Sequence, residues 1–127
     1  DMMKKIIQIC MLFTVIAFLS ACEYEFIELK KPDIDPDVPL SFKSDIVPIF
    51  QDDGCVACHS TTGIAFSLEE AQAYQSIQNN NLVDTANPQS SPLYVVPDPN
   101  SAEQHDKYSV DNAAKVLIWI QQGAKNN

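Results

Sequence analysis

The sequence contains no arginine, and its eight lysines stand against 17 aspartates and glutamates, which gives a net charge of −9 over 127 residues. Proteins that bind nucleic acid neutralise phosphates with positive side chains, so this charge balance excludes nucleic acid as a partner. The same sign argues against adsorption to anionic lipid head groups. It favours a partner protein that carries a basic docking patch.

The sequence also lacks an apolar run long enough to span a membrane. Lys4 and Lys5 precede an apolar stretch from Ile6 to Leu19, which is shorter than the roughly 20 residues that a spanning helix needs. A basic start followed by a short apolar run is typical of a secretory signal peptide. We therefore expect residues 1–21 to be removed on export.

The apolar stretch ends in Leu19-Ser20-Ala21-Cys22, where small residues precede a cysteine. This ending resembles the lipobox of bacterial lipoproteins. The resemblance implies cleavage before Cys22 and acylation of its thiol and new amino group, and two acyl chains hold a protein stably at a membrane. It further implies a lipid anchor in the cell envelope of a Gram-negative bacterium, at the periplasmic face of the inner or outer membrane or at the cell surface.

An acidic, proline-containing segment follows the lipobox. Residues 23–40 hold six acidic side chains and three prolines, with few apolar residues at regular spacing. Such segments stay extended, because their charges repel and they have little apolar surface to bury. We expect residues 22–40 to form a tether and residues 41–127 to form the folded domain.

Two cysteines fall within that domain, in Cys55-Val56-Ala57-Cys58-His59, the C-x-x-C-H pattern of c-type haem attachment. At this spacing one helical turn presents both thiols to the two vinyl groups of a haem. The adjacent histidine is then carried under the ring, where it binds the iron. The motif predicts one covalent haem c, held by Cys55 and Cys58 through thioether bonds and by His59 as an iron ligand.

The two cysteines could serve in three other ways. A disulfide is the ordinary expectation for two cysteines of an exported protein. A thioredoxin-like redox pair requires a flanking βαβ pattern, and no alternating strand pattern flanks the motif. A structural zinc site generally needs four protein ligands, so zinc would require both cysteines and both histidines of the domain, and it stays a formal alternative.

The first helix of the domain is expected to begin at Ser41 or Ser44, because either side chain can cap it. Pro48 should limit its regularity. The chain is then expected to break before the haem motif. The residues at helical spacing that predict this helix are Phe42, Ile46, Ile49 and Phe50.

Two further helices are predicted, separated by an irregular loop over residues 82–106. One begins at Ser67, where Glu70 completes a capping box, and ends at Asn79. The last begins after Ser109 and stops at Gly123. We expect large apolar residues to form the core or to line the haem pocket, namely Phe50, Tyr74, Leu117, Trp119 and Ile120.

Four segments together resemble the small cytochrome c domains of bacterial lipoproteins, especially those of Bacteroidetes and Planctomycetes. They are Asp45-Ile46-Val47-Pro48-Ile49-Phe50, the motif from Cys55 to His59, Ser91-Pro92-Leu93-Tyr94, and Trp119-Ile120-Gln121-Gln122-Gly123-Ala124. The resemblance covers Phe42 to Asn127. It implies an all-α cytochrome c-like domain, with three to four helices around one covalent haem and a long irregular loop. It also implies one-electron transfer and not an enzymatic reaction.

The sequence departs from these relatives at the sixth iron ligand. Such domains commonly supply a methionine shortly before the last helix, but Met11 is the last methionine of this chain. The corresponding segment contains His105, which we expect to be the ligand, with the Asp106 carboxylate orienting it. A solvent-exposed loop histidine is the alternative. Imidazole in place of thioether predicts a lower reduction potential.

The expected function is that of a membrane-anchored monohaem electron carrier. If His105 does not reach the iron, an open coordination position would suit gas sensing or peroxide chemistry, although the chain has no arginine to polarise bound peroxide. A third alternative is a lipoprotein in which haem has a structural role.

Overall fold

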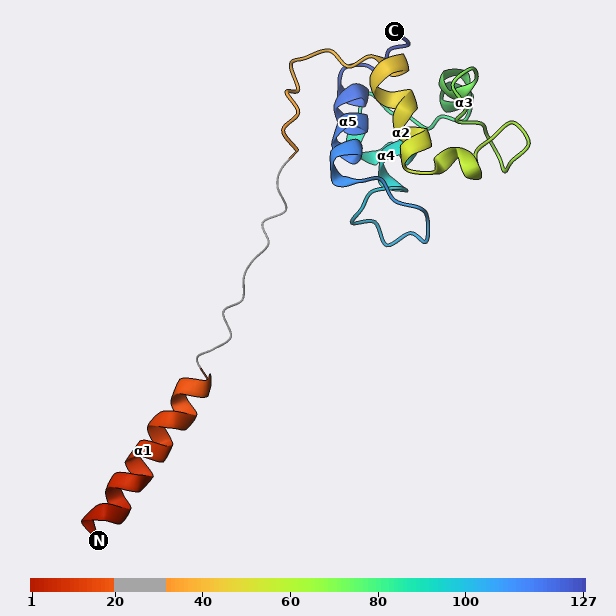
Figure 1. The fold of residues 1–127 in the computed structure, drawn as a ribbon. Coiled ribbons are helices and arrows are strands. Elements are labelled where there is room, and N and C mark those ends of the chain that lie inside the picture. Colours follow the sequence, from red (N-terminus) through yellow and green to blue (C-terminus); the bar gives the residue numbers. More distant parts are fainter. Residues whose placement is uncertain (20–31) are drawn as a thin grey trace. The chain divides into compact units, whose positions relative to one another are not determined.

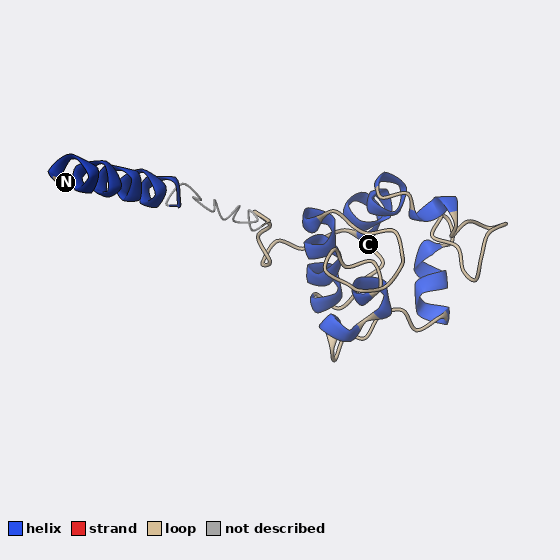
Figure 2. Cartoon of the chain, turned by 90° about the horizontal axis from the view of Figure 1, so that it is seen from below, coloured by secondary structure: helices blue, strands red, loops and turns tan. Residues whose placement is uncertain are grey.

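The computed structural model describes residues 1–19 and 32–127, and these residues form helices and turns without a β-strand (Figures 1 and 2). The prediction of an all-α protein is confirmed for this part of the chain. The chain divides into two compact units, one up to residue 31 and the other from Pro32 to Asn127, which are described separately. The predicted lipidation site, Cys22, and residues 22–31 of the predicted tether lie outside the described residues.

The first unit contains one helix, α1 (Met2–Leu19). This helix includes the whole apolar run that predicts a secretory signal, with Lys4 and Lys5 in its first turns. None of the helices within residues 1–19 and 32–127 combines the length and the apolar character needed to cross a membrane. Removal of residues 1–21 stays a prediction from the sequence.

The first predicted helix of the domain consists of a π-helical turn, η1 (Phe42–Ile46), that continues into α2 (Val47–Asp52). Ser41 caps it, since its hydroxyl accepts a hydrogen bond from the Ser44 N–H at 3.3 Å. Pro48 stands in the first turn of α2, where a missing N–H is tolerated. The side chains that predicted this helix are all buried: Phe42, Ile46, Ile49 and Phe50.

The second predicted helix, α3 (Ala73–Asn79), starts later than expected. Ser67 does not cap it, because the Ser67 hydroxyl accepts from the N–H of Glu69, only two residues ahead, at 3.2 Å. The N–H of Leu68 is bonded to the carbonyl of His59 at 2.7 Å. This contact with the Cys-x-x-Cys-His motif, which the local pattern does not reveal, holds the capping-box segment outside the helix.

The segment predicted as an irregular loop contains two short helices, η3 (Pro88–Ser90) and α4 (Pro92–Val95). Each begins with a proline, whose fixed φ suits the first helical position. Each is about one turn long, so neither produces a periodic pattern that could be recognised in the sequence. Leu93 of α4 is buried.

The last helix, α5 (Val110–Gln121), has the predicted start and stop. The Ser109 hydroxyl caps it by accepting from the Asn112 N–H at 3.2 Å, and Gly123 follows with φ of 97°. Its buried face is Ala113, Val116, Trp119 and Ile120.

The core of the second unit forms where η1, α3 and α5 meet. The ring of Phe42 lies 5.2 Å from that of Trp119 and 5.2 Å from that of Tyr74, measured between centroids. Trp119, Ile120 and Phe50 are almost completely buried. These contacts bring the first and last helical segments of the domain together, as Figure 1 shows for the region around α2 and α5.

The last residues of the predicted tether are bound to the folded domain. The Gln122 Nε2 donates to the carbonyls of Pro36 and Val38, both at 2.9 Å, and its Oε1 accepts from the Leu40 N–H at 2.8 Å. Residues from Pro32 onward therefore belong to the same compact unit as the helices, whereas the sequence suggested a boundary between residues 40 and 41. The bonds join residues more than 80 positions apart, so composition alone could not predict them.

Candidate functional site

The Cys-x-x-Cys-His motif forms one tight turn. Gly54 takes a left-handed conformation, φ 74°, and a 3₁₀ turn, η2 (Cys55–Ala57), follows. The carbonyl of Cys55 then accepts from the N–H of Cys58 at 3.3 Å and from that of His59 at 2.9 Å. Cys55 and Cys58 are both free thiols, so the disulfide alternative is not what the structure contains. The turn brings both thiols and the histidine to one edge of the domain.

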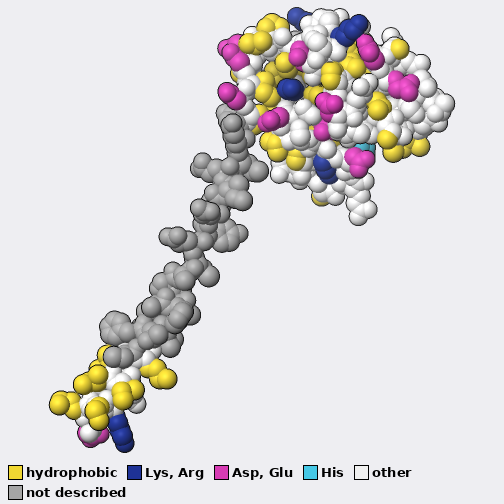
Figure 3. Space-filling model, viewed as in Figure 1, with side chains coloured by type: hydrophobic (Ala, Val, Ile, Leu, Met, Phe, Trp, Pro, Cys, Tyr) yellow, Lys and Arg dark blue, Asp and Glu magenta, His cyan; other side chains and the backbone are white. Residues whose placement is uncertain are grey.

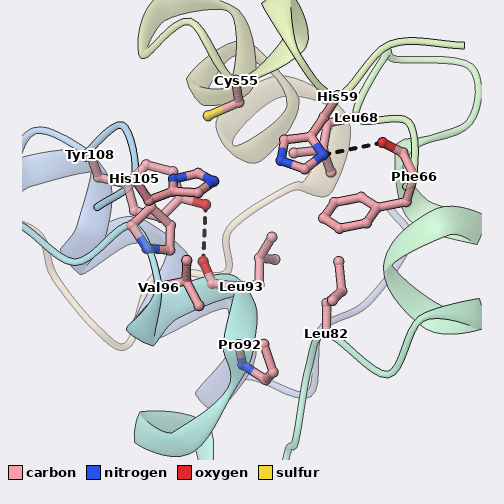
Figure 4. Close-up of a pocket in the computed structure, with 11 residues that line it drawn as sticks. Cys55, His59, Phe66, Leu68, Leu82, Pro92, Leu93, Val96, His105 and Tyr108 are labelled. Atoms are coloured by element: carbon pink, nitrogen blue, oxygen red, sulfur yellow. Dashed lines mark hydrogen bonds between the residues drawn. The ribbon is translucent and has the colours of Figure 1, made fainter. Parts of the chain in front are cut away.

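A cavity of about 260 Å³ opens beside this turn (Figure 4). Cys55, His59, His105 and Tyr108 border it. The rest of its wall is apolar and comes from three separate segments of the chain: Phe66, Leu68, Leu82, Pro92, Leu93, Val96 and Pro97. A second cavity of about 400 Å³ shares Cys55, His59 and His105 and adds Cys58, Ile64, Gln104 and Asp106. The four predicted site residues, Cys55, Cys58, His59 and His105, therefore all border the second cavity.

His59 is oriented by a backbone carbonyl. The side chain is 8% exposed, and its Nδ1 lies 3.3 Å from the carbonyl oxygen of Phe66. A carbonyl oxygen only accepts, so Nδ1 carries the proton in this hydrogen bond. Nε2 then keeps its lone pair, and it lies on the side of the ring turned toward His105 (Figure 4). This is the tautomer that a metal-binding histidine requires.

His105 faces His59 from the opposite side of the site. The two ring centroids are 6.0 Å apart and the ring planes are inclined by 24°. His105 Nδ1 is 2.8 Å from the carbonyl oxygen of Asp106, so in the neutral imidazole Nδ1 carries the proton and Nε2 has the lone pair. The sequence predicted that the Asp106 carboxylate would orient this ring. The structure assigns that contact to the backbone carbonyl of Asp106 instead.

The spacing of the two imidazoles suits a metal ion between them. Imidazoles bound on opposite sides of one metal, each at a metal–nitrogen distance of about 2 Å, have ring centres roughly 6 Å apart. The observed separation of 6.0 Å agrees with this value. Together with the adjacent thiols and the apolar wall, these are the residues that could hold a covalently attached haem. Within residues 1–19 and 32–127 no group of three or more His, Cys, Asp or Glu side chains forms a metal site by itself.

Burial changes the chemistry of Cys55. Desolvation, followed by the negative charge of Asp53, raises the pKa of the Cys55 thiol to about 11. The thiol is therefore protonated at neutral pH and is a poor nucleophile inside the folded domain.

Tyr108 is a second buried residue of the cavity wall, besides His59, that carries a polar group. Its hydroxyl donates to the carbonyl of Leu93 at 3.0 Å, and burial raises the pKa of the phenol well above its usual value. The Tyr108 N–H also donates to the carbonyl of Pro97 at 2.8 Å. These two bonds close the base of the loop that carries His105.

Sequence reasoning predicted four donor residues, which the structure brings around one cavity, but it did not predict the wall beside them. The residues expected in the core or in the pocket do not border the 260 Å³ cavity, namely Phe50, Tyr74, Leu117, Trp119 and Ile120. Phe66 and Leu68 lie only seven and nine residues after His59, and that proximity to the motif is the signal that could have identified them.

Comparison with protein-family models, with curated protein sequences and with solved structures gives no match.

Proposed function

We propose that this protein is a membrane-anchored monohaem c-type cytochrome that transfers single electrons to or from a redox partner. The observation that carries the proposal is the pair of imidazoles, 6.0 Å apart, with both Nδ1 atoms bonded to carbonyls beside two free thiols. When bound, a haem supplies a one-electron iron couple to such a site. The resemblance of the sequence to small cytochrome c domains points the same way.

In this function the donor residues hold the cofactor and the wall excludes water. Cys55 and Cys58 would hold the haem through thioether bonds, and His59 and His105 would be its iron ligands. The apolar side chains around the 260 Å³ cavity would keep water away, which favours electron transfer over reaction with solvent. The protein is a carrier in this proposal and not an enzyme.

The charge of the domain supports a basic partner. Acidic side chains are scattered over the visible face of the folded domain (Figure 3). Asp53 and Asp106 both act electrostatically on Cys55, so negative charge lies close to the edge where the thioether bonds would form. Complementary charge accelerates encounter between redox partners.

Anchoring of the domain is proposed from the sequence. Acylated Cys22 would hold the protein at the cell envelope, on the periplasmic face of either membrane or at the cell surface. Residues following Cys22 would then connect the lipid to the domain.

One observation favours a second function. The side chain of His105 is exposed and its described hydrogen bond is to the adjacent residue. A ligand held this loosely could leave the iron open to a diatomic gas or to peroxide. Rapid carbon monoxide binding by the ferrous protein would support this gas-sensing or peroxide function.

Redox titration and stopped-flow mixing test the proposal. A carrier with two imidazole ligands should titrate as one reversible one-electron couple, at a lower potential than comparable methionine-ligated domains. Electron exchange with a basic redox protein should be fast and should slow as salt increases, because screening weakens the attraction. A rate that does not depend on salt would contradict the proposed docking.

A further inference from the structure

Phe66 contacts the imidazole of His59 in two independent ways. Its carbonyl oxygen lies 3.3 Å from His59 Nδ1, and its phenyl ring stacks on the imidazole with 4.2 Å between centroids and 19° between planes. We propose that Phe66 is the positioning residue of His59. The carbonyl selects the nitrogen that faces the cavity, and the phenyl ring sets the plane of the imidazole. The inference rests on the proposed function, in which His59 is an iron ligand.

The two contacts restrain different motions. The imidazole can turn about its Cβ–Cγ bond, and a single hydrogen bond of 3.3 Å restrains this rotation only weakly. A flat aromatic surface at stacking distance opposes this rotation, because tilting the imidazole would break the ring contact. The plane of an axial imidazole determines how its π orbitals meet the iron d orbitals, so a restraint on that plane has an electronic consequence.

The backbone around Phe66 is held by the haem-attachment motif itself. The N–H of Ile64 donates to the carbonyl of Cys58 at 3.0 Å, and the N–H of Leu68 donates to the carbonyl of His59 at 2.7 Å. Ala65, between them, has φ of 58°, a left-handed conformation that is uncommon for a residue other than glycine. Such conformations persist where the surroundings determine them, often at functional sites. The motif thus directs both the carbonyl and the ring of Phe66 toward its own histidine.

Phe66 differs from the core phenylalanines in what it contacts. Phe42 is 3% exposed and packs on Trp119 and Tyr74 in the core. Phe66 is only half-buried, and it borders the cavity of about 260 Å³ next to His59 (Figure 4). A change at Phe42 should therefore alter stability, whereas a change at Phe66 should alter the ligand.

Electron paramagnetic resonance of the ferric, haem-loaded full chain tests this difference, since the principal g values report the orientation of axial imidazole planes. Phe66→Leu removes the flat ring and keeps an apolar side chain. The principal g values of this variant should shift and its signals should broaden. Phe66→Tyr keeps the ring and should retain the wild-type g values. Phe42→Leu should retain them too, while its thermal unfolding temperature falls.

The outcomes separate this inference from the proposed function. Wild-type g values in Phe66→Leu would overturn the positioning role, and so would an equal shift in Phe66→Tyr, which keeps the stacking surface. If the wild-type protein contains haem and gives a low-spin signal, unchanged g values in Phe66→Leu contradict only the positioning role and leave the proposed function intact. Absence of haem from the wild-type protein would defeat the proposed function itself.

Discussion

At the scale of single residues, the two imidazoles of the site differ in how firmly they are held. His59 is buried, and both the carbonyl and the ring of Phe66 restrain it. His105 is exposed, and its described hydrogen bond is to the carbonyl of its neighbour Asp106. If both bind the iron, His105 is the ligand that external molecules should displace first.

Replacing His105 tests its role directly. His105→Ala removes the sixth ligand, so the ferric visible spectrum should change from low spin to high spin, and carbon monoxide should bind the ferrous form at least about tenfold faster. Absorption spectroscopy and flash photolysis measure these two quantities. Glu103→Gln, at an exposed position two residues earlier that borders neither cavity, is the matched control and should behave as the wild type. An unchanged spectrum in His105→Ala would show that His105 is not a ligand.

Among the three glycines, Gly63 is the one at which an added methyl group should reduce stability most. A Cβ there would lie 2.0 Å from the carbonyl oxygen of Cys58, so the loop after the motif would have to move. We expect Gly63→Ala to lower the free energy of unfolding by roughly 3 kcal/mol or more. Chemical denaturation of the loaded protein measures it.

Gly54 provides the control for this substitution. Its φ of +74° disfavours alanine, but a Cβ would meet nothing within 4 Å. Gly54→Ala should therefore lower the free energy of unfolding by only about 1 kcal/mol. Equal losses for the two variants would mean that the close approach at Gly63 is not what fixes the loop.

At the scale of elements, the turn before η3 and α4 is held by one carboxylate. Asp84 Oδ1 accepts from the N–H groups of Asn87, at 3.1 Å, and Ala86, at 2.9 Å, and these bonds lower the pKa of Asp84. The buried hydroxyl of Ser91 ties the same turn to the start of α4 by accepting from the Asp84 N–H at 2.9 Å. The turn thereby positions α4, whose residues line the cavity.

Asp84 should make stability depend on pH in the acid range. Since its pKa is lower in the folded state, its contribution is present above the ordinary aspartate value of about 3.9 and is lost as pH falls through the lowered pKa. Asp84→Asn keeps an acceptor oxygen but not the charge. Its urea midpoint should fall below that of the wild type at pH 7, and the difference should shrink below about pH 4. A difference that does not vary with pH would contradict this account.

Element boundaries could be predicted from the sequence where local chemistry sets them. Two predicted helix starts, at Ser41 and Ser109, and one predicted helix end, at Gly123, depend on residues within four positions. All three were confirmed. The start of α3 was wrong because Leu68 is bonded to His59, outside the local window. The helix α4 was missed because one turn contains no repeat.

At the scale of the whole molecule, the site exists only when distant segments meet. The motif supplies Cys55, Cys58 and His59, whereas Leu82, Leu93 and His105 come from up to 50 residues further along the chain. The grouping of the two cysteines and two histidines could be predicted, because these residue types are rare in this composition. The wall could not, because leucine and proline side chains carry no signal of which cavity they face.

Gln122 connects the two ends of the domain. Gln122→Ala removes three hydrogen bonds to the backbone of residues 36–40, each worth about 1 kcal/mol or less where partly exposed. Hydrogen exchange in peptides covering these residues should become faster, while the visible spectrum stays unchanged. Gln121→Ala, at the exposed neighbouring position, is the control. Unchanged exchange in Gln122→Ala would mean that other contacts hold the segment.

The central claim is that a haem is covalently bonded to Cys55 and Cys58, and the most direct test measures intact mass together with the visible spectrum. The protein should be produced in a host with a competent attachment pathway. We predict a chain heavier by one haem, with no free thiol at either cysteine and a low-spin spectrum. A colourless protein of unmodified mass that retains both thiols would contradict the account.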